Sequence, residues 1–179
     1  ALMLLAVMPL LVSKIYYIHV LIMCMIFACI TSVWNLIAGY AGVFSFGFQA
    51  LFGTGAYVSA LLSIHLGWSP WITMWIGALA AMGVGSVVAI PSLKLKALPY
   101  ICIATMCMGE IIRLIASNLT SITRGELGLS QIPKLFSGNI KVSSYYLILV
   151  MLTMTLLLVT KIVNSPMGMS LKAMKDSQE

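Results

Sequence analysis

Two residues of opposite charge, Glu110 and Arg113, lie three positions apart inside an apolar stretch of the sequence. On a helix, residues at this spacing are neighbours, so the carboxylate and the guanidinium can pair. Ionisable residues at membrane depth face protein interior or water, which makes a functional site one interpretation of this intramembrane ion pair. The other interpretation is a purely structural pair. It is supported by the position of both residues near the polar end of the stretch, where long side chains reach the interface.

A second polar group, the amide of Gln49, is followed by Gly53, Ala56 and Ala60 at spacings of four, three and four. On a helix these residues share one side, so Gln49 heads a groove of small residues. A buried amide needs hydrogen-bond partners, which a neighbouring helix or a passing solute can supply. We therefore expect this stripe to serve helix packing or a solute path and not to face lipid.

Small residues also recur every fourth position further along the chain, at Thr73, Gly77, Ala81, Gly85 and Ala89. A helix with such a face lets a neighbour approach closely, because there is almost no side chain between the backbones. The pattern predicts a helix packing seam, and a substrate path along this face is the alternative interpretation.

Several kinds of chemistry are disfavoured by what the sequence lacks. It has no GxxxxGK[ST] motif, so it cannot bind ATP by a P-loop and any energy source must be another subunit. It has four acidic and two histidine residues, too few for paired carboxylate chemistry or a His-rich metal site. We therefore expect no catalytic residues, no metal and no cofactor. The ten basic residues are scattered singly, which speaks against a nucleic-acid partner.

The composition requires a lipid bilayer, because 61% of the 179 residues are apolar and only 8% are charged. A membrane-crossing helix needs about 20 apolar residues, and no charged residue occurs at all from position 15 to position 93. The sequence thus predicts an all-α, polytopic bundle of transmembrane helices with about five full spans. These spans are residues 15–38, 46–66, 70–91, 97–117 and 145–163, and residues 1–12 read as the end of a truncated span before them.

The polar stretch 118–144 is expected to lie outside the hydrocarbon as a loop, since it contains glycines, a proline and several charges. Positive charges divide almost evenly between the two sides, so they leave the orientation open.

After the last span, Pro166 ends the helix and Gly168 frees the chain to turn. The following stretch reads as a short amphipathic helix with an apolar and a basic face. An anchor on anionic lipid headgroups is one interpretation and a docking segment for a partner protein is the other. The residues of interest are Gly168, Leu171, Lys172, Met174 and Lys175.

Three stretches together resemble a known family, the larger-type permease subunit of branched-chain amino acid transporters of the ATP-binding-cassette (ABC) class. Residues 35–57, NLIAGYAGVFSFGFQALFGTGAY, are similar to the family's N-L-x-x-G-x-x-G-x-x-S-x-G-[HQ]-x-x-F-x-G-x-G-A-Y. Residues 100–113, YICIATMCMGEIIR, continue to TRGELGLSQIP at 123–133, where the family usually has T-G-G-x-x-G-[IL]-x-G-I-P. Residues 165–176, SPMGMSLKAMKD, are similar to its S-x-x-G-R-A-L-x-A-I-R-x segment.

The sequence departs from the family pattern at three places. Phe48 stands where His or Gln is usual, with Gln49 one place later, while Arg124 and Gln131 each replace a glycine. These positions lie in the segment and the loop expected to touch the substrate or a binding protein, so the departures bear on the ligand.

The resemblance implies that residues 1–179 form one permease domain of the inner (plasma) membrane, incomplete at its C-terminus. It implies partners as well: a second homologous permease, two cytoplasmic ATPases and a periplasmic or lipoprotein substrate-binding protein. Residues 118–144 would then be external, and residues 165–179 would begin the cytoplasmic coupling helix that contacts an ATPase.

The implied activity is translocation of leucine, isoleucine and valine by alternating access. Two alternatives remain at the level of the sequence. One is a urea or short-amide permease of the same superfamily, and the other is a passive channel or a membrane scaffold, which has no reason to possess the 165–176 segment.

Overall fold

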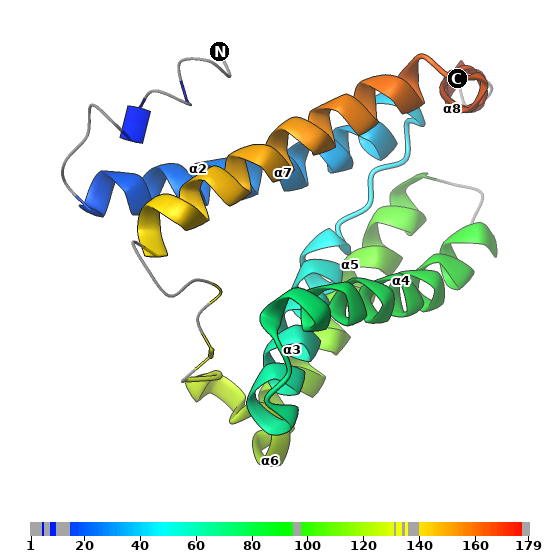
Figure 1. Ribbon diagram of the computed structural model, residues 1–179. Coiled ribbons are helices and arrows are strands. Elements are labelled where there is room, and N and C mark those ends of the chain that lie inside the picture. The colour runs from blue at the N-terminus through cyan, green and yellow to red at the C-terminus, as the bar shows by residue number, and fades with distance from the viewer. Residues whose placement is uncertain are drawn as a thin grey trace. The chain divides into compact units, whose positions relative to one another are not determined.

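The described residues of the computed structural model, 5, 8–9, 15–94, 98–130, 132–133, 135 and 140–176, are helical or irregular and include no strand. This confirms the all-α prediction. Seven α-helices are present in this part of the chain, with one π-helical turn (η1) and one 3-10 turn (η2) (Figure 1). In chain order they are α2 (Ile15–Asn35), η1 (Leu36–Tyr40), α3 (Phe48–Leu66), α4 (Pro70–Lys94), α5 (Leu98–Asn118), α6 (Thr120–Thr123), η2 (Gly125–Leu127), α7 (Ile140–Val163) and α8 (Pro166–Asp176).

Four helical segments among the described residues are long and apolar enough to cross a membrane. They are Tyr16–Tyr40, Pro70–Ile90, Pro99–Asn118 and Val142–Val163. These agree with four of the five expected spans. The fifth, α3, has 19 residues and is interrupted by polar Gln49 and His65 and by small residues, which lower its hydropathy. The run 1–12 lies outside the described residues except at positions 5, 8 and 9.

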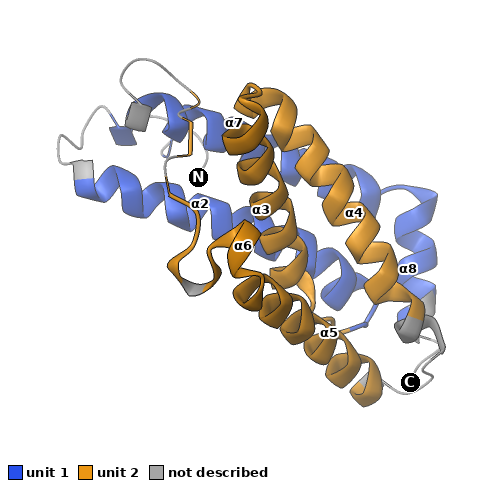
Figure 2. Cartoon of the chain, turned by 90° about the horizontal axis from the view of Figure 1, so that it is seen from below, with its two compact units in different colours: residues 1–43, 136–179 blue, residues 44–135 orange. Residues whose placement is uncertain are grey.

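The chain divides into two compact units (Figure 2). Unit 1 comprises residues 1–43 and 136–179, and unit 2 comprises residues 44–135. The single permease domain expected over residues 1–179 stays a prediction.

In unit 1, α2 and α7 lie side by side and run in the same direction (Figure 1). Their shared core consists of Ile18 and Met25 from α2 with Tyr145 and Leu152 from α7. Tyr145 is fully buried, and its hydroxyl donates a hydrogen bond of 2.6 Å to the carbonyl oxygen of Leu5. A buried tyrosine needs such a partner, so this bond ties the start of the chain to α7.

In unit 2, α3 and α4 pack antiparallel along the small-residue face of α4. Gly77 lies against Gly55, where an added Cβ would come within 2.5 Å of the Gly55 carbonyl oxygen, and Gly85 lies against Leu51. At one end of the seam, buried Thr73 shares hydrogen bonds of 2.8 Å with Ser63 and 3.3 Å with Ser59.

The seam predicted on α4 is therefore confirmed from Thr73 to Gly85, while Ala89 is exposed. The opposing face of α3, which the sequence analysis did not single out, consists of Leu51, Gly55, Ser59 and Ser63.

The turn between α3 and α4 follows from its residues. Gly67 ends α3 with φ 63°, a left-handed conformation that glycine adopts without strain, and Pro70 begins α4. Helix α7 ends at Val163, just before the predicted break at Pro166, but it starts at Ile140. Residues 140–144 of the polar stretch 118–144 form the first turn of α7, and the location of this stretch outside the hydrocarbon stays a prediction.

Candidate functional site

The first turn of α3 starts well inside unit 2 and not at its edge. Gly47, the residue before α3, packs against Thr105 of α5 and Val88 of α4, with an added Cβ 3.4 Å from the Thr105 carbonyl oxygen. At 1.5 Å per residue, the helical distances from Val88 to Lys94 and from Leu98 to Thr105 are roughly 9–10 Å. The start of α3 is therefore recessed by almost two helical turns from the connection between α4 and α5.

The non-helical backbone that leads to this recessed start is held by side chains of α5. The Phe46 N–H donates a hydrogen bond of 3.2 Å to Thr105 Oγ1, and Cys102 Sγ donates one of 3.2 Å to the Phe44 carbonyl oxygen. Thr105 is buried, and its hydroxyl reaches the Ile101 carbonyl oxygen of its own helix at 2.9 Å. Irregular backbone at membrane depth is tolerated only where protein satisfies it, and this is the arrangement here.

Gln49 lies in the first turn of this recessed helix and is exposed within unit 2. Gly53 and Ala60 are half-buried, Ala56 is exposed, and a Cβ added to Gly53 would meet no atom of the described residues within 4 Å. The stripe therefore turns away from the α3–α4 seam. Its expected role in packing or as a solute path stays a prediction.

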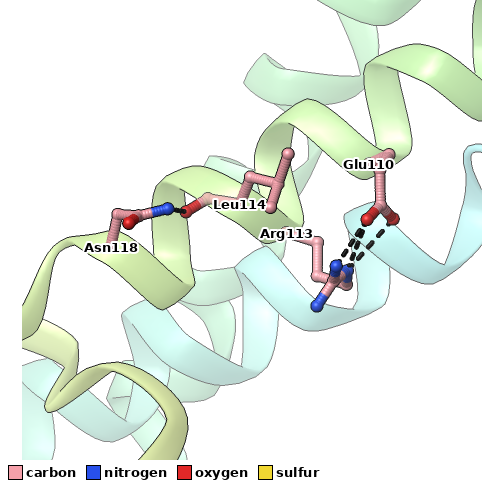
Figure 3. Close-up of polar contacts among 4 residues, drawn as sticks. All are labelled: Glu110, Arg113, Leu114 and Asn118. Carbon is pink, nitrogen blue, oxygen red and sulfur yellow. Dashed lines mark hydrogen bonds and ion pairs between the residues drawn. The ribbon is translucent and has the colours of Figure 1, made fainter.

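Glu110 and Arg113 pair on an exposed face of α5 (Figure 3). Arg113 Nε donates a bifurcated hydrogen bond to the two Glu110 carboxylate oxygens at 2.9 and 3.0 Å, and Arg113 Nη2 donates to Glu110 Oε1 at 2.5 Å. Glu110 directly follows Gly109, which lies against Gly47 and Ala50 at the start of α3. The pair is thus on the turn of α5 that supports the recessed helix, while its role in transport stays a prediction.

The segment expected to contact an ATPase forms α8, but it begins at Pro166 and not after Gly168. Proline is tolerated in the first helical turn, where its missing N–H has no partner to lose. The sequence analysis expected Gly168 to free the chain to turn, and this prediction is wrong. Gly168 lies inside the helix, where an added Cβ would collide with the Val163 carbonyl oxygen and come within 2.7 Å of the Ile162 carbonyl oxygen. Glycine is needed there because α8 crosses closely over the end of α7.

The two lysines of α8, Lys172 and Lys175, point to the end of η1. Lys175 Nζ donates to the Gly39 carbonyl oxygen at 3.3 Å, and Lys172 Nζ lies 5.7 Å from the centre of the Tyr40 ring. Leu171 is half-buried, and the side chain of Met174 is outside the described ones. The most exposed apolar side chains of α8 are Met167 and Met169, at 72% and 67%.

The loop after α5 is ordered by its own hydrogen bonds. Thr123 Oγ1 donates to the Ala116 carbonyl oxygen at 2.6 Å and accepts the Gly125 N–H at 3.2 Å. Arg124 has φ 59°, and its guanidinium donates to Ser130 Oγ at 2.9 Å. The family usually has glycine at this position, and the left-handed backbone explains why.

The sequence analysis missed Thr105 and Tyr40. Thr105 was passed over because it is a hydroxyl residue within an apolar span. The non-helical backbone near Phe46 needs polar partners, and this need could have pointed to Thr105. Tyr40 belongs to a motif that was recognised, but its contact with Lys172 depends on how α8 folds back. Among the described residues, no three His, Cys, Asp or Glu side chains gather into a metal site.

Comparison with known proteins places the chain in a family. The family described as "Branched-chain amino acid transport system / permease component" matches residues 16–179. The "High-affinity branched-chain amino acid transport system permease protein LivM" of Escherichia coli (strain K12) is 37% identical over 100 residues, which cover 56% of this chain and 23% of that protein. LivM of Salmonella typhimurium (strain LT2) is 35% identical over 100 residues, which again cover 56% of this chain and 23% of that protein. The match thus spans about a quarter of the length of these relatives, and no solved structure matches the chain.

The family match covers nearly the whole chain, and it coincides with several helices that are long and apolar enough to cross a membrane. The chain belongs to the family of branched-chain amino acid permease components of the inner membrane.

Proposed function

We propose that this chain is the permease subunit of an ABC importer that translocates leucine, isoleucine and valine by alternating access. The observation that carries the proposal is the family match over residues 16–179, supported by the similarity to LivM, whose name specifies branched-chain amino acid transport. ATP would be hydrolysed by two partner ATPases, and substrate would be delivered by a binding protein. A second homologous permease would complete the pore, and no cofactor is required of this chain.

We propose five membrane crossings, made by α2, α3, α4, α5 and α7. Three of them, α3, α4 and α5, lie between α2 and α7 in the chain. The parallel course of α2 and α7 supports this number, because a chain that leaves one helix and enters a parallel one must cross the bilayer an odd number of times in between. Helices α4 and α5 account for two crossings. The helix α3 supplies the third, and its small residues Gly55, Ser59 and Ser63 pack against α4.

With α8 cytoplasmic, as the resemblance implies, the polar stretch after α5 is external and the connection between α4 and α5 is cytoplasmic. The recessed start of α3 then lies in the cytoplasmic half of the membrane. A single cysteine at Ser170 tests this orientation, since it should react with a membrane-impermeant thiol reagent only from the cytoplasmic side. Labelling from outside would reverse the topology.

The substrate path proposed here passes the first turn of α3. The first N–H groups of a helix lack intrahelical partners and carry partial positive charge, which suits the carboxylate of an amino acid zwitterion. Broken helices in transporters bind substrate in this way. Exposed Gln49 and the small face at Gly53 and Ala56 continue from that turn and leave room for an aliphatic side chain.

Helix α8 is proposed to dock into a groove of an ATPase. Met167 and Met169 are the exposed apolar side chains that support this contact, and methionine adapts well to a groove. Replacing both with aspartate should abolish co-purification of the ATPases while the chain still inserts into the membrane. Unchanged co-purification would exclude α8 as the docking element.

The decisive experiment is uptake. The full-length permease would be reconstituted with its partner permease, ATPases and binding protein, and radiolabelled leucine would be followed with unlabelled leucine, isoleucine, valine or urea as competitors. We expect the three amino acids to compete and urea not to. Competition by urea alone would identify a short-amide permease, and uptake without ATP would identify a passive channel.

The path itself is tested with Gly53→Leu against the matched control Gly53→Ala. Leucine at this position should lower uptake at least tenfold by filling the path, whereas alanine, which meets no neighbour, should leave uptake near the parental rate. Normal uptake with the leucine variant would place this face outside the path.

A further inference from the structure

Helix α8 makes two separate contacts with the end of η1. The Lys175 ammonium donates a hydrogen bond to the Gly39 carbonyl oxygen, and the Lys172 ammonium faces the ring of Tyr40. The two lysines are three positions apart, so they lie on one side of α8, and they meet two successive residues of η1. A pair of contacts of this kind restrains both the position and the rotation of one helix against the other.

The end of η1 is suited to receive positive charge. The last carbonyl groups of a helix have no intrahelical N–H partner, and they carry partial negative charge. The face of a tyrosine ring also attracts a cation. Both lysines therefore meet groups that favour an ammonium, although their side chains are otherwise exposed.

The other side of α8 is fixed to α7. Gly168 lies directly on the carbonyl groups of Ile162 and Val163, so the first turn of α8 and the last turn of α7 are in close contact. Immediately after η1 the chain loses its helical hydrogen bonds. Gly42 has φ 73°, and residues 42–46 are irregular up to the start of α3.

We infer that Lys172 and Lys175 fasten α8 to η1, so that a displacement of α8 carries η1 with it and reaches the irregular residues 42–46, which lead to the recessed start of α3. The two lysines are thus positioning residues that link the ATPase contact to the segment leading into the proposed substrate path. The inference rests on the proposed function of α8 as the docking element.

Distance measurements between spin labels test the link in the assembled transporter. Labels are attached to cysteines replacing Ala173 on α8 and Ile37 on η1, both exposed, in a background without the four native cysteines. The parent should give one narrow distance that is the same without nucleotide and after vanadate trapping with ATP. The double variant Lys172→Met and Lys175→Met should lose the narrow distance and give a broad distribution.

Two controls separate this role from a general structural one. Arginine at both positions keeps a cation on each contact and should retain the narrow distance. Lys161→Met removes an exposed basic residue of α7 that makes no hydrogen bond to η1 among the described residues, and this variant should also retain the narrow distance. In the double methionine variant, leucine uptake per ATP hydrolysed should fall, whereas in both controls it should stay at the parental value.

A narrow distance in the double methionine variant would overturn the inference, and so would a parental distance that shifts on vanadate trapping. The comparison without nucleotide does not depend on which solute is carried. A parent whose ATP hydrolysis is not stimulated by leucine would instead count against the proposed function, and the distances would still decide whether the lysines hold α8 on η1.

Discussion

Replacing Gly77 with alanine tests the close backbone approach between α4 and α3. The added methyl group would lie 2.5 Å from the Gly55 carbonyl oxygen and 3.1 Å from the Ser59 Cβ. Carbon–oxygen contacts between closely packed helices lie at about 3.3–3.6 Å, so the two backbones must separate by roughly 1 Å. Both nearest neighbours are short and stiff, which leaves no flexible side chain to absorb the change.

Two effects of this substitution oppose each other. Overpacking of a fitted interface costs about 1–3 kcal/mol, whereas replacing a helical glycine with alanine contributes about 0.5–1 kcal/mol to stability. Gly83 lies on the same helix, and a Cβ added there would meet no atom of the described residues within 4 Å. Gly83→Ala should thus gain the same helix stabilisation as Gly77→Ala without overpacking the α3–α4 interface. The difference in unfolding free energy between the two variants should be about 1–3 kcal/mol.

The assay is equilibrium unfolding of the purified full-length chain in mixed micelles, with SDS as denaturant and far-UV circular dichroism as the signal. Gly77→Ala should unfold at lower SDS than the parent, and Gly83→Ala at the same or higher SDS. Gly55→Ala should fall between them, because its Cβ would lie 3.4 Å from the Gly77 carbonyl oxygen. If Gly77→Ala proves as stable as Gly83→Ala, the close approach of the two helices is not present in the protein.

Three further predictions concern other parts of the chain. Glu110→Gln and Arg113→Gln should each lower the yield of folded protein, because each strands its partner near the membrane, and the double variant should recover part of the loss; additive losses would refute the coupling. Arg124→Gly should raise the melting temperature slightly, because glycine adopts φ 59° without the roughly 1–2 kcal/mol that other residues incur, and Arg124→Ala should not; equal effects would contradict the strain. Gly168→Ala should expose α8 to limited proteolysis, because its methyl group collides with the end of α7, and an unchanged digestion pattern would count against that crossing.

Much of the helical framework follows from the sequence because apolar runs and their breakers determine it. The seam on α4 was predictable, since only one of its faces carries a small residue at every fourth position. The facing side of α3 was not, because small residues line two faces of that helix. Gly53, Ala56 and Ala60 lie on one face and Gly55, Ser59 and Ser63 on the other, and the choice depends on the hydroxyl of Thr73 in the partner helix.

The candidate site was less predictable than the framework, because its contacts join segments that are far apart in the chain. The spacing of Glu110 and Arg113 predicted their contact, since both lie on one helix. The contacts of Lys172 and Lys175 with η1 span more than 130 positions of sequence and depend on α2 and α7 being parallel. The hydrogen bond from Phe46 to Thr105 likewise depends on how deeply α3 starts inside unit 2.

The π-helical turn at Leu36–Tyr40 sets the angular position of the last residues of the helix that begins with α2. A π turn holds about one residue more than the α turn it replaces, so it rotates the subsequent residues by about 100° around the helix axis. This offset decides that the Gly39 carbonyl group and the Tyr40 ring meet the lysines of α8. If the turn relaxed to an α-helix, both groups would swing away together while the backbone kept its hydrogen bonds. The π-helical turn thus fixes the rotational position of the two groups on η1 that α8 contacts.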